Sequence, residues 1–335
     1  MKPLRIIVDD NIPFIKGRLE KIAEVEYTDQ SGFTPEMVRD ADAVVIRTRT
    51  RCNEALLGAS SVKLVATATI GTDQIDIPWC AANGITVRNA PGCNAPGVAQ
   101  YVWSALLRTG FDPAKHTLGI VGCGNVGSIV AQWGRMLGAR ILVNDPLREK
   151  ELAQKGWRTV SLAELLGQSD AVTLHTPLTR SGEHPTYHLI SAPQLALMKP
   201  GATIVNAARG PVTDTAALKD AIRDSHLTAI IDTWEGEPKI DTGLLDMARY
   251  GTFHIAGYSR QGKQRATRMV LEAVAGYFGV DIDMSGLEPA YRLPAALSAE
   301  RIMESYDPAG DDEALRAEPA RFDELRANYD YRPEP

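Results

Sequence analysis

Short apolar runs alternate with amphipathic stretches from the start of the chain. The runs at 4–8, 43–46, 63–68 and 85–87 have the length and composition of buried strands. Apolar residues at 12–23 follow a helical spacing instead. Strands that alternate with helices predict βαβ units around a parallel sheet.

A second and stronger series of the same kind begins at Leu118. Its later runs lie at 141–143, 171–174, 202–205 and 229–231, with helical patterns between them. The chain is therefore expected to form an α/β protein with two Rossmann-like, doubly wound parallel sheets. The first sheet is expected to be flavodoxin-like.

Glycines and prolines separate the two series. They cluster at 89–97, just before an apolar helical pattern at 98–107, and predict a hinge. Another helical pattern at 261–278 would carry the chain back to the first sheet. We predict a first domain over 1–93, a second domain over 94–257 and a return helix within 258–280.

The last part of the chain, 281–335, is irregular and charged. It nevertheless contains several apolar side chains that could dock on a folded surface: Tyr291, Leu293, Leu315, Phe322, Leu325 and Tyr329. A loosely ordered tail and a small interaction unit both fit this composition.

Size and composition agree with two domains. A chain of 335 residues exceeds the length at which one hydrophobic core usually stops growing. No apolar stretch approaches the roughly 18 residues of a membrane span, and the N-terminus shows no signal-type apolar region. We therefore predict a cytoplasmic protein without a membrane partner.

Charge and cysteine spacing exclude several classes of ligand. The net charge of −6 and the scattered arginines argue against nucleic acid as a partner. The four cysteines have no C-x-x-C spacing, which argues against zinc and against a disulfide framework. We expect free thiols, no metal and a small-molecule ligand.

A glycine-rich turn follows the strand-like run at Leu118. Its sequence is Gly122, Cys123, Gly124, Asn125, Val126 and Gly127, and a helical pattern at 129–137 comes next. Gly122 would permit the tight turn, Gly124 would let the backbone approach a pyrophosphate, and Gly127 would bring helix and strand close together. In this context the motif predicts a dinucleotide site, whereas a glycine-rich turn without a ligand is the alternative.

Asp145 ends the next strand-like run, 18 residues after Gly127. Its carboxylate would accept hydrogen bonds from the adenosine ribose and would repel a 2′-phosphate, which favours NAD over NADP. NADP remains the alternative cofactor, because the Arg148 side chain could bind its 2′-phosphate.

Three polar residues follow the later strand-like runs, where ligands collect in an open parallel sheet. They are Arg209, Glu237 and His254. Hydride transfer from a hydroxy acid to a nicotinamide requires a base for the hydroxyl proton, and a histidine suits that task. A carboxylate would orient the imidazole, and an arginine would bind the substrate carboxylate. Each residue also has a structural alternative, as a buried histidine, a solvated turn or an exposed arginine.

The same residues resemble the motifs of the D-2-hydroxyacid dehydrogenase family. The family pattern runs N-x-x-R-G, D-x-x-x-x-E-P and a histidine before a glycine, and the chain matches it at 206–210, 232–238 and 254–257. The resemblance implies an NAD-dependent dehydrogenase with Arg209, Glu237 and His254 as its catalytic set. It also implies cofactor contacts at Asn125, Val126, Thr176, Asp232 and Gly257.

Segments 9–13, 66–73 and 90–95 are similar to one subgroup of that family. This subgroup acts on a phosphorylated four-carbon hydroxy acid in vitamin B6 synthesis. The likeness implies substrate contacts at Thr48, Thr67 and Tyr258, and it implies that 281–335 is a shortened dimerisation segment of a homodimer.

Other functions fit the same motifs. A phosphoglycerate or simple 2-hydroxyacid dehydrogenase would use identical chemistry with a different pocket, and an NADH-sensing binding protein would keep only the fold. Arg47, Arg49 and Arg51 are candidates for binding a substrate phosphate, and they would share one face if the strand at 43–46 continued that far. A solvated basic edge is the alternative.

Overall fold

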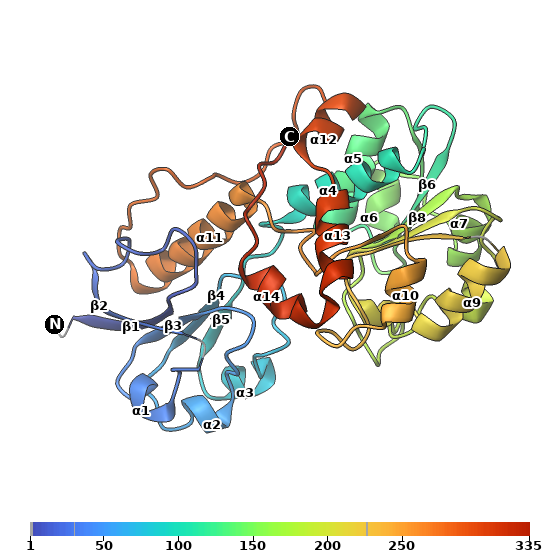
Figure 1. Ribbon diagram of the computed structural model, residues 1–335. Helices are drawn as coiled ribbons and strands as arrows, with labels where there is room; N and C mark the ends of the chain where they lie inside the picture. The colour runs from blue at the N-terminus through green and yellow to red at the C-terminus, as the bar shows by residue number, and fades with distance from the viewer. Residues whose placement is uncertain (1–2, 30, 226) are drawn as a thin grey trace. The chain divides into compact units, whose positions relative to one another are not determined.

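The computed structural model describes residues 3–29, 31–225 and 227–335, and the chain divides into two compact units (Figure 1). Unit 1 comprises Met1–Asn94 and Arg260–Arg292, and unit 2 comprises Ala95–Ser259 and Leu293–Pro335. Each unit contains one parallel sheet. The predicted fold class, two doubly wound α/β units, is confirmed.

Unit 1 is built on a five-stranded sheet in the order β2-β1-β3-β4-β5, with all neighbours parallel. The strands are β1 (Leu4–Asp9), β2 (Ala23–Thr28), β3 (Ala43–Ile46), β4 (Leu64–Thr67) and β5 (Thr86–Arg88). This is the flavodoxin-like order that the sequence predicted.

Alternate residues of these strands enter two separate cores. On one face, Val8 and Val45 pack against the long helix α11 (Arg260–Phe278). On the other face, Ile7 and Val44 belong to the core beneath the short helices α1 (Pro35–Val38), α2 (Glu54–Leu57) and α3 (Ile77–Ala82). The predicted helix at 261–278 is therefore present, and it covers one face of the first sheet.

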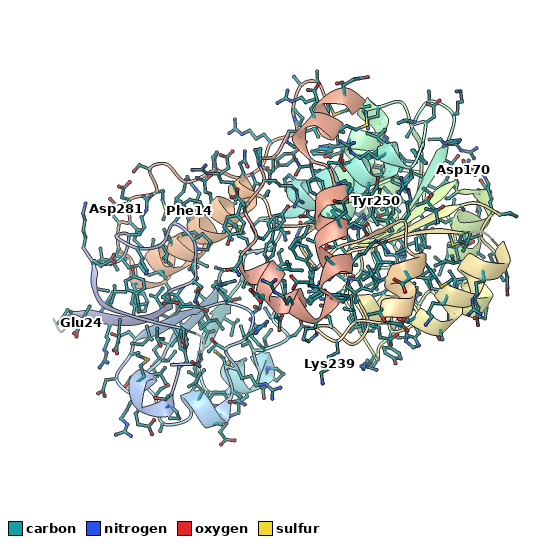
Figure 2. The ribbon with its side chains drawn as sticks, viewed as in Figure 1. Phe14, Glu24, Asp170, Lys239, Tyr250 and Asp281 are labelled. Carbon is teal, nitrogen blue, oxygen red and sulfur yellow. The ribbon has the colours of Figure 1, made fainter. Side chains whose placement is uncertain are left out.

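The helix predicted at 12–23 is wrong. Residues 10–22 form successive turns, because Pro13 lacks an amide hydrogen and Phe14 and Gly17 adopt positive φ angles of 64° and 83°. The apolar spacing was still meaningful, since Ile15 and Leu19 are fully buried in the core that α11 covers. Figure 2 shows Phe14 near α11, where the Thr267 hydroxyl donates to the Pro13 carbonyl at 2.6 Å.

Unit 2 contains a six-stranded parallel sheet in the order β11-β10-β9-β8-β6-β7. Its strands are β6 (Thr117–Val121), β7 (Arg140–Asn144), β8 (Ala171–Leu174), β9 (Thr203–Asn206), β10 (Thr228–Ile231) and β11 (Tyr250–Gly251). Strand order reverses between β6 and β8. In such sheets ligands bind outside the carboxyl ends of the strands at this switch point.

Helices surround the second sheet. They are α4 (Ala95–Arg108), α5 (Asn125–Met136), α6 (Glu149–Gln154), α7 (Leu162–Gln168), α8 (Ala192–Leu195), α9 (Thr215–Ser225) and α10 (Thr242–Met247), with the 3₁₀ turn η1 (Gly210–Val212). α4 is buried along most of its length, as its apolar sequence predicts, and Trp103 and Leu106 are inaccessible to solvent.

The chain from Leu293 onward packs onto unit 2, so the loosely ordered tail is wrong, while the interaction unit stays a prediction. It forms α12 (Ala299–Ser305), α13 (Ala309–Ala317), the 3₁₀ turn η2 (Pro319–Arg321) and α14 (Phe322–Ala327). Leu315 and Phe322 are buried. Asp312 of α13 accepts a 2.6 Å hydrogen bond from the Gly251 amide, beside the Tyr250 that Figure 2 labels. We call residues 293–335 the C-terminal segment.

The described residues add three observations on ligand class. The four cysteines are free and buried. Among these residues, no group of three or more His, Cys, Asp or Glu side chains could hold a metal ion. No helix in the described part of the chain is both long enough and apolar enough to cross a membrane.

Candidate active site

The glycine-rich loop lies at the switch point of unit 2, between β6 and α5. Gly122 has a φ of 85°, and a Cβ there would lie 2.8 Å from the His175 carbonyl oxygen. A Cβ on Gly127 would lie 2.1 Å from the Gly122 carbonyl oxygen. At Gly124, by contrast, a Cβ would meet nothing within 4 Å. Two glycines are therefore required by packing, while the third leaves space in front of α5.

A second feature of the switch point comes from the end of β8. The buried Thr176 hydroxyl has no hydrogen-bond partner within the described ranges. Its Cγ2 would lie 3.0 Å from a Cβ on Gly122, so Thr176 borders the glycine-rich loop. Buried hydroxyls normally have partners. An unpartnered hydroxyl beside an open helix N-terminus fits a bound dinucleotide, which would bring both anionic groups and acceptors.

Asp145 and Arg148 both contact the glycine-rich loop. Asp145 accepts a 2.9 Å hydrogen bond from the Cys123 amide. Arg148 forms a two-pronged ion pair with Glu151 at 2.9 and 2.8 Å and also donates to the Cys123 carbonyl. These contacts use three of the five guanidinium N–H donors and pair the charge of Arg148 with Glu151, so Arg148 is less available to bind a 2′-phosphate. The geometry therefore favours NAD.

Replacing Asp145 with alanine is expected to lower the preference for NAD over NADP about 10-fold or more. The change removes the predicted acceptor for the ribose and a negative charge that would repel a 2′-phosphate. Measuring kcat/KM for both cofactors checks this. Glu149→Ala is the matched control, because it removes an exposed negative charge four residues away. An unchanged ratio in Asp145→Ala would contradict the assignment.

Arg209 stands on a loop that Asn206 shapes at the end of β9. The Asn206 amide nitrogen donates to the Arg209 carbonyl at 3.1 Å, and its oxygen accepts from the Ala208 amide at 3.2 Å. Gly210 is required, because a Cβ there would lie 2.0 Å from the Trp234 carbonyl carbon. The N-x-x-R-G motif thus fixes the backbone that carries Arg209, whose Nη1 donates to the Ala208 carbonyl at 2.8 Å.

Glu237 and His254 form a hydrogen-bonded pair. The His254 Nδ1 lies 2.7 Å from Glu237 Oε1, and both side chains are about a quarter exposed, at 26% and 28%. Burial raises the pKa of Glu237, but the hydrogen bond from His254 and the charges of His254 and Arg326 outweigh it and hold this pKa below its usual range. An ionised carboxylate only accepts, so Nδ1 donates its hydrogen to Glu237, and Nε2 is the ring nitrogen that is left to exchange a proton.

The backbone holds His254 in an unusual conformation. Its φ is 60°, in the left-handed region that most side chains avoid, and its amide donates to the Asp232 carbonyl at 2.8 Å. The buried Asp232 carboxylate accepts from the Thr252 hydroxyl and from the amides of Ile255 and Ala256, at 2.7, 2.8 and 3.0 Å. Asp232 therefore anchors the loop on both sides of His254. Its predicted contact with a nicotinamide stays a prediction.

Sequence reasoning missed the part of the C-terminal segment that supports this loop. Arg332 is buried and donates to the carbonyls of Gly97 at 3.1 Å, Ile255 at 3.0 Å and Ala256. The Tyr258 ring makes edge contacts with Tyr329 and Tyr331 at 6.0 and 6.1 Å between centroids. No sequence motif predicted these contacts, because the sequence around a buried arginine in a charged segment does not differ from that around a solvent-exposed arginine.

The remaining predicted residues lie in different surroundings. Gly257 and Tyr258 are half-buried in unit 2 directly after the Asp232-anchored loop. Thr67 belongs to unit 1, where it is buried at the end of β4 and its hydroxyl lies 2.7 Å from that of Thr69. Thr48 is exposed in the loop after β3. β3 ends at Ile46, so the strand alternation that would align Arg47, Arg49 and Arg51 does not extend to them.

Comparison with known proteins identifies the family of the chain. The family model described as "D-isomer specific 2-hydroxyacid dehydrogenase, NAD binding domain" matches residues 88–256. The chain is 45% identical to the erythronate-4-phosphate dehydrogenase of Bacteroides fragilis, over 99% of this chain and 97% of that protein. It is 38% identical to the erythronate-4-phosphate dehydrogenase of Pseudomonas entomophila, over 98% of this chain and 92% of that protein.

Solved structures of the same family share the fold. D-lactate dehydrogenase from Aquifex aeolicus, complexed with NAD and lactic acid, has a TM-score of 0.69 and 26% identity over 82% of this chain and 95% of that one. NAD-bound 3-phosphoglycerate dehydrogenase of Entamoeba histolytica has a TM-score of 0.69 and 25% identity, over 88% of this chain and 99% of that one. The chain thus belongs to the D-isomer specific 2-hydroxyacid dehydrogenase family and is an NAD-dependent dehydrogenase.

Proposed function

We propose that this enzyme oxidises 4-phospho-D-erythronate at C2, giving 3-hydroxy-2-oxo-4-phosphooxybutanoate, a step of vitamin B6 synthesis. Relatives named erythronate-4-phosphate dehydrogenase are 38% to 45% identical over nearly the whole chain, and they support this choice of substrate. The observation that carries the chemistry is the 2.7 Å hydrogen bond between Glu237 and His254. It leaves one imidazole nitrogen free to take a proton.

His254 acts as the base for the C2 hydroxyl. Its Nε2 accepts the hydroxyl proton, and the electron pair of the broken O–H bond becomes the second bond of the ketone. NAD, when bound, supplies the acceptor for the hydride that leaves C2. Glu237 holds the imidazole in the correct tautomer and favours its protonated form. Arg209 binds the substrate carboxylate and polarises the C2 oxygen.

Several groups of unit 2 would hold the cofactor. Gly122, Gly124 and Gly127 would form the backbone turn around the pyrophosphate, and the first amides of α5, at Asn125 and Val126, would meet its charge. The carboxylate of Asp145 would accept hydrogen bonds from the adenosine ribose. The remaining proposed contacts, toward the nicotinamide end, are Thr176, Asp232 and Gly257.

Unit 1 is the proposed substrate domain. Thr48 and Thr67 contribute hydroxyl contacts from it, and Tyr258 contributes a contact from unit 2. We also propose that the enzyme is a homodimer in which 281–335 contributes to the contact, and that it acts in the cytoplasm. Light scattering on the purified protein tests the dimer, and a monomer at micromolar concentration would contradict it.

A substrate panel tests the reaction. With NAD present, kcat/KM for 4-phospho-D-erythronate is expected to exceed that for glycerate 3-phosphate and lactate by at least about 10-fold. A preference for glycerate 3-phosphate would identify a different member of the family. If no hydroxy acid or keto acid is turned over but NADH binds and alters association with a protein partner, a sensing role replaces the enzymatic one.

A further inference from the structure

Arg326 of α14 lies beside Tyr258, and one of its hydrogen-bond donors has no acceptor in the described part of the chain. Its guanidinium carbon lies 5.6 Å from the centroid of the Tyr258 ring. The side chain is half-buried, and its buried Nε–H has no acceptor among the residues that the structure describes. A buried donor without a partner is costly, and native proteins rarely keep one without a reason.

Neighbouring arginines of the C-terminal segment show the contrast. Arg332 donates hydrogen bonds to backbone carbonyls and, at 2.9 Å, to the side-chain oxygen of Gln100. Arg316 donates to Asp312 and to the carbonyls of Leu245 and Ala248. Arg321 pairs with two glutamates at the surface. Arg326 thus differs from these three, which have structural partners.

The charge of Arg326 also reaches the catalytic pair. It contributes to the lowered pKa of Glu237, which is hydrogen-bonded to His254. Glu237, His254, Tyr258 and Arg326 all belong to unit 2, so this neighbourhood exists within one compact unit. A cationic side chain whose Nε–H has no acceptor in the described part of the chain therefore lies by Tyr258, and its charge acts on Glu237, the partner of His254.

We propose that Arg326 binds the phosphate group of the substrate, so that the C-terminal segment is part of the active site. This assignment rests on the proposed function, which supplies a substrate with two anionic ends. Arg209 is assigned to the carboxylate next to C2, so the phosphate at the other end of the substrate requires a second cation. The planar guanidinium of arginine can donate two parallel hydrogen bonds to phosphate oxygens, and stacking on Tyr258 would orient its plane.

Kinetics of Arg326→Gln and Arg321→Gln test the proposal. Both variants remove one positive charge from the same segment, but Arg321 is exposed and lies outside the proposed site. In Arg326→Gln, KM for 4-phospho-D-erythronate is expected to rise about 10- to 100-fold, as for a lost hydrogen bond to a charged group. KM for D-erythronate, which has no phosphate, should rise at least about 10-fold less than KM for 4-phospho-D-erythronate. Arg321→Gln should resemble the parent enzyme.

Binding of inorganic phosphate to the NADH-loaded protein, measured by calorimetry, supplies a readout that needs no turnover. Weaker phosphate binding in Arg326→Gln than in Arg321→Gln supports the proposal, and equal binding overturns it. An equal rise of KM for both substrates overturns it as well. If the parent enzyme does not oxidise 4-phospho-D-erythronate, the proposed function fails, while the phosphate measurement still decides the role of Arg326. Arg326→Lys, which keeps the charge, serves if the glutamine variant does not fold.

Discussion

Replacing His254 with glutamine is expected to lower kcat about 1000-fold while NADH still binds. General base catalysis typically contributes 10²- to 10⁴-fold, and a glutamine amide cannot accept the hydroxyl proton. Its NH₂ group can still donate to Glu237, so the carboxylate keeps a partner. Steady-state assays with NAD and 4-phospho-D-erythronate give kcat, and fluorescence titration gives the Kd for NADH.

His184→Gln provides the control for this substitution. His184 is exposed on a loop of unit 2, and its recorded ion pair is a long 3.9 Å contact with the neighbouring Glu183. Its replacement should leave kcat unchanged. If His254→Gln kept more than about a tenth of the parent kcat, the imidazole would not be the base.

Replacing Arg332 with methionine is expected to destabilise the protein by about 3–5 kcal/mol, because several buried acceptors lose their donor at about 1–3 kcal/mol each. Methionine keeps much of the volume but leaves the carbonyls of Gly97, Ile255 and Ala256 without their donors. The guanidinium also lies 4.2 Å from the centroid of the Tyr306 ring. Chemical denaturation followed by tryptophan fluorescence measures the change in unfolding free energy.

Activity should fall together with stability in Arg332→Met. Two of the carbonyls that Arg332 binds, those of Ile255 and Ala256, lie directly after His254, so a loosened loop would misplace the imidazole even in molecules that remain folded. Arg321→Met, at an exposed position of the same segment, should change the unfolding free energy by less than about 0.5 kcal/mol. A similarly small effect at Arg332 would show that the loop is held in place by other contacts.

Sequence patterns located most strands but not every element. Continuous apolar runs identify β3, β8 and β10 because strands of a parallel sheet are buried on both faces. β2 was missed because it lies at the edge of its sheet. None of its residues is fully buried, so its sequence mixes apolar and polar residues and shows no continuous apolar run. β11 has only two residues, too few to show any period. The turns at 10–22 imitated a helix because their buried residues share its spacing.

The sequence by itself determined which residues stand at the carboxyl ends of the strands. Local rules suffice for this: glycines mark the turn at 122–127, Asn206 and Gly210 shape the Arg209 loop, and parallel strands bring their ends to one edge. The Glu237 and His254 pair followed from the same rules.

Only the tertiary structure decided what supports and completes this set. Arg332 reaches Gly97 across 235 positions of sequence, and Arg326 lies against Tyr258 from a separate helix. Such contacts have no period and no motif, since they arise when a distant segment packs onto a finished sheet. For the same reason the sequence could not distinguish the buried Arg332 from the exposed Arg321, because burial depends on the whole fold and not on neighbouring residues.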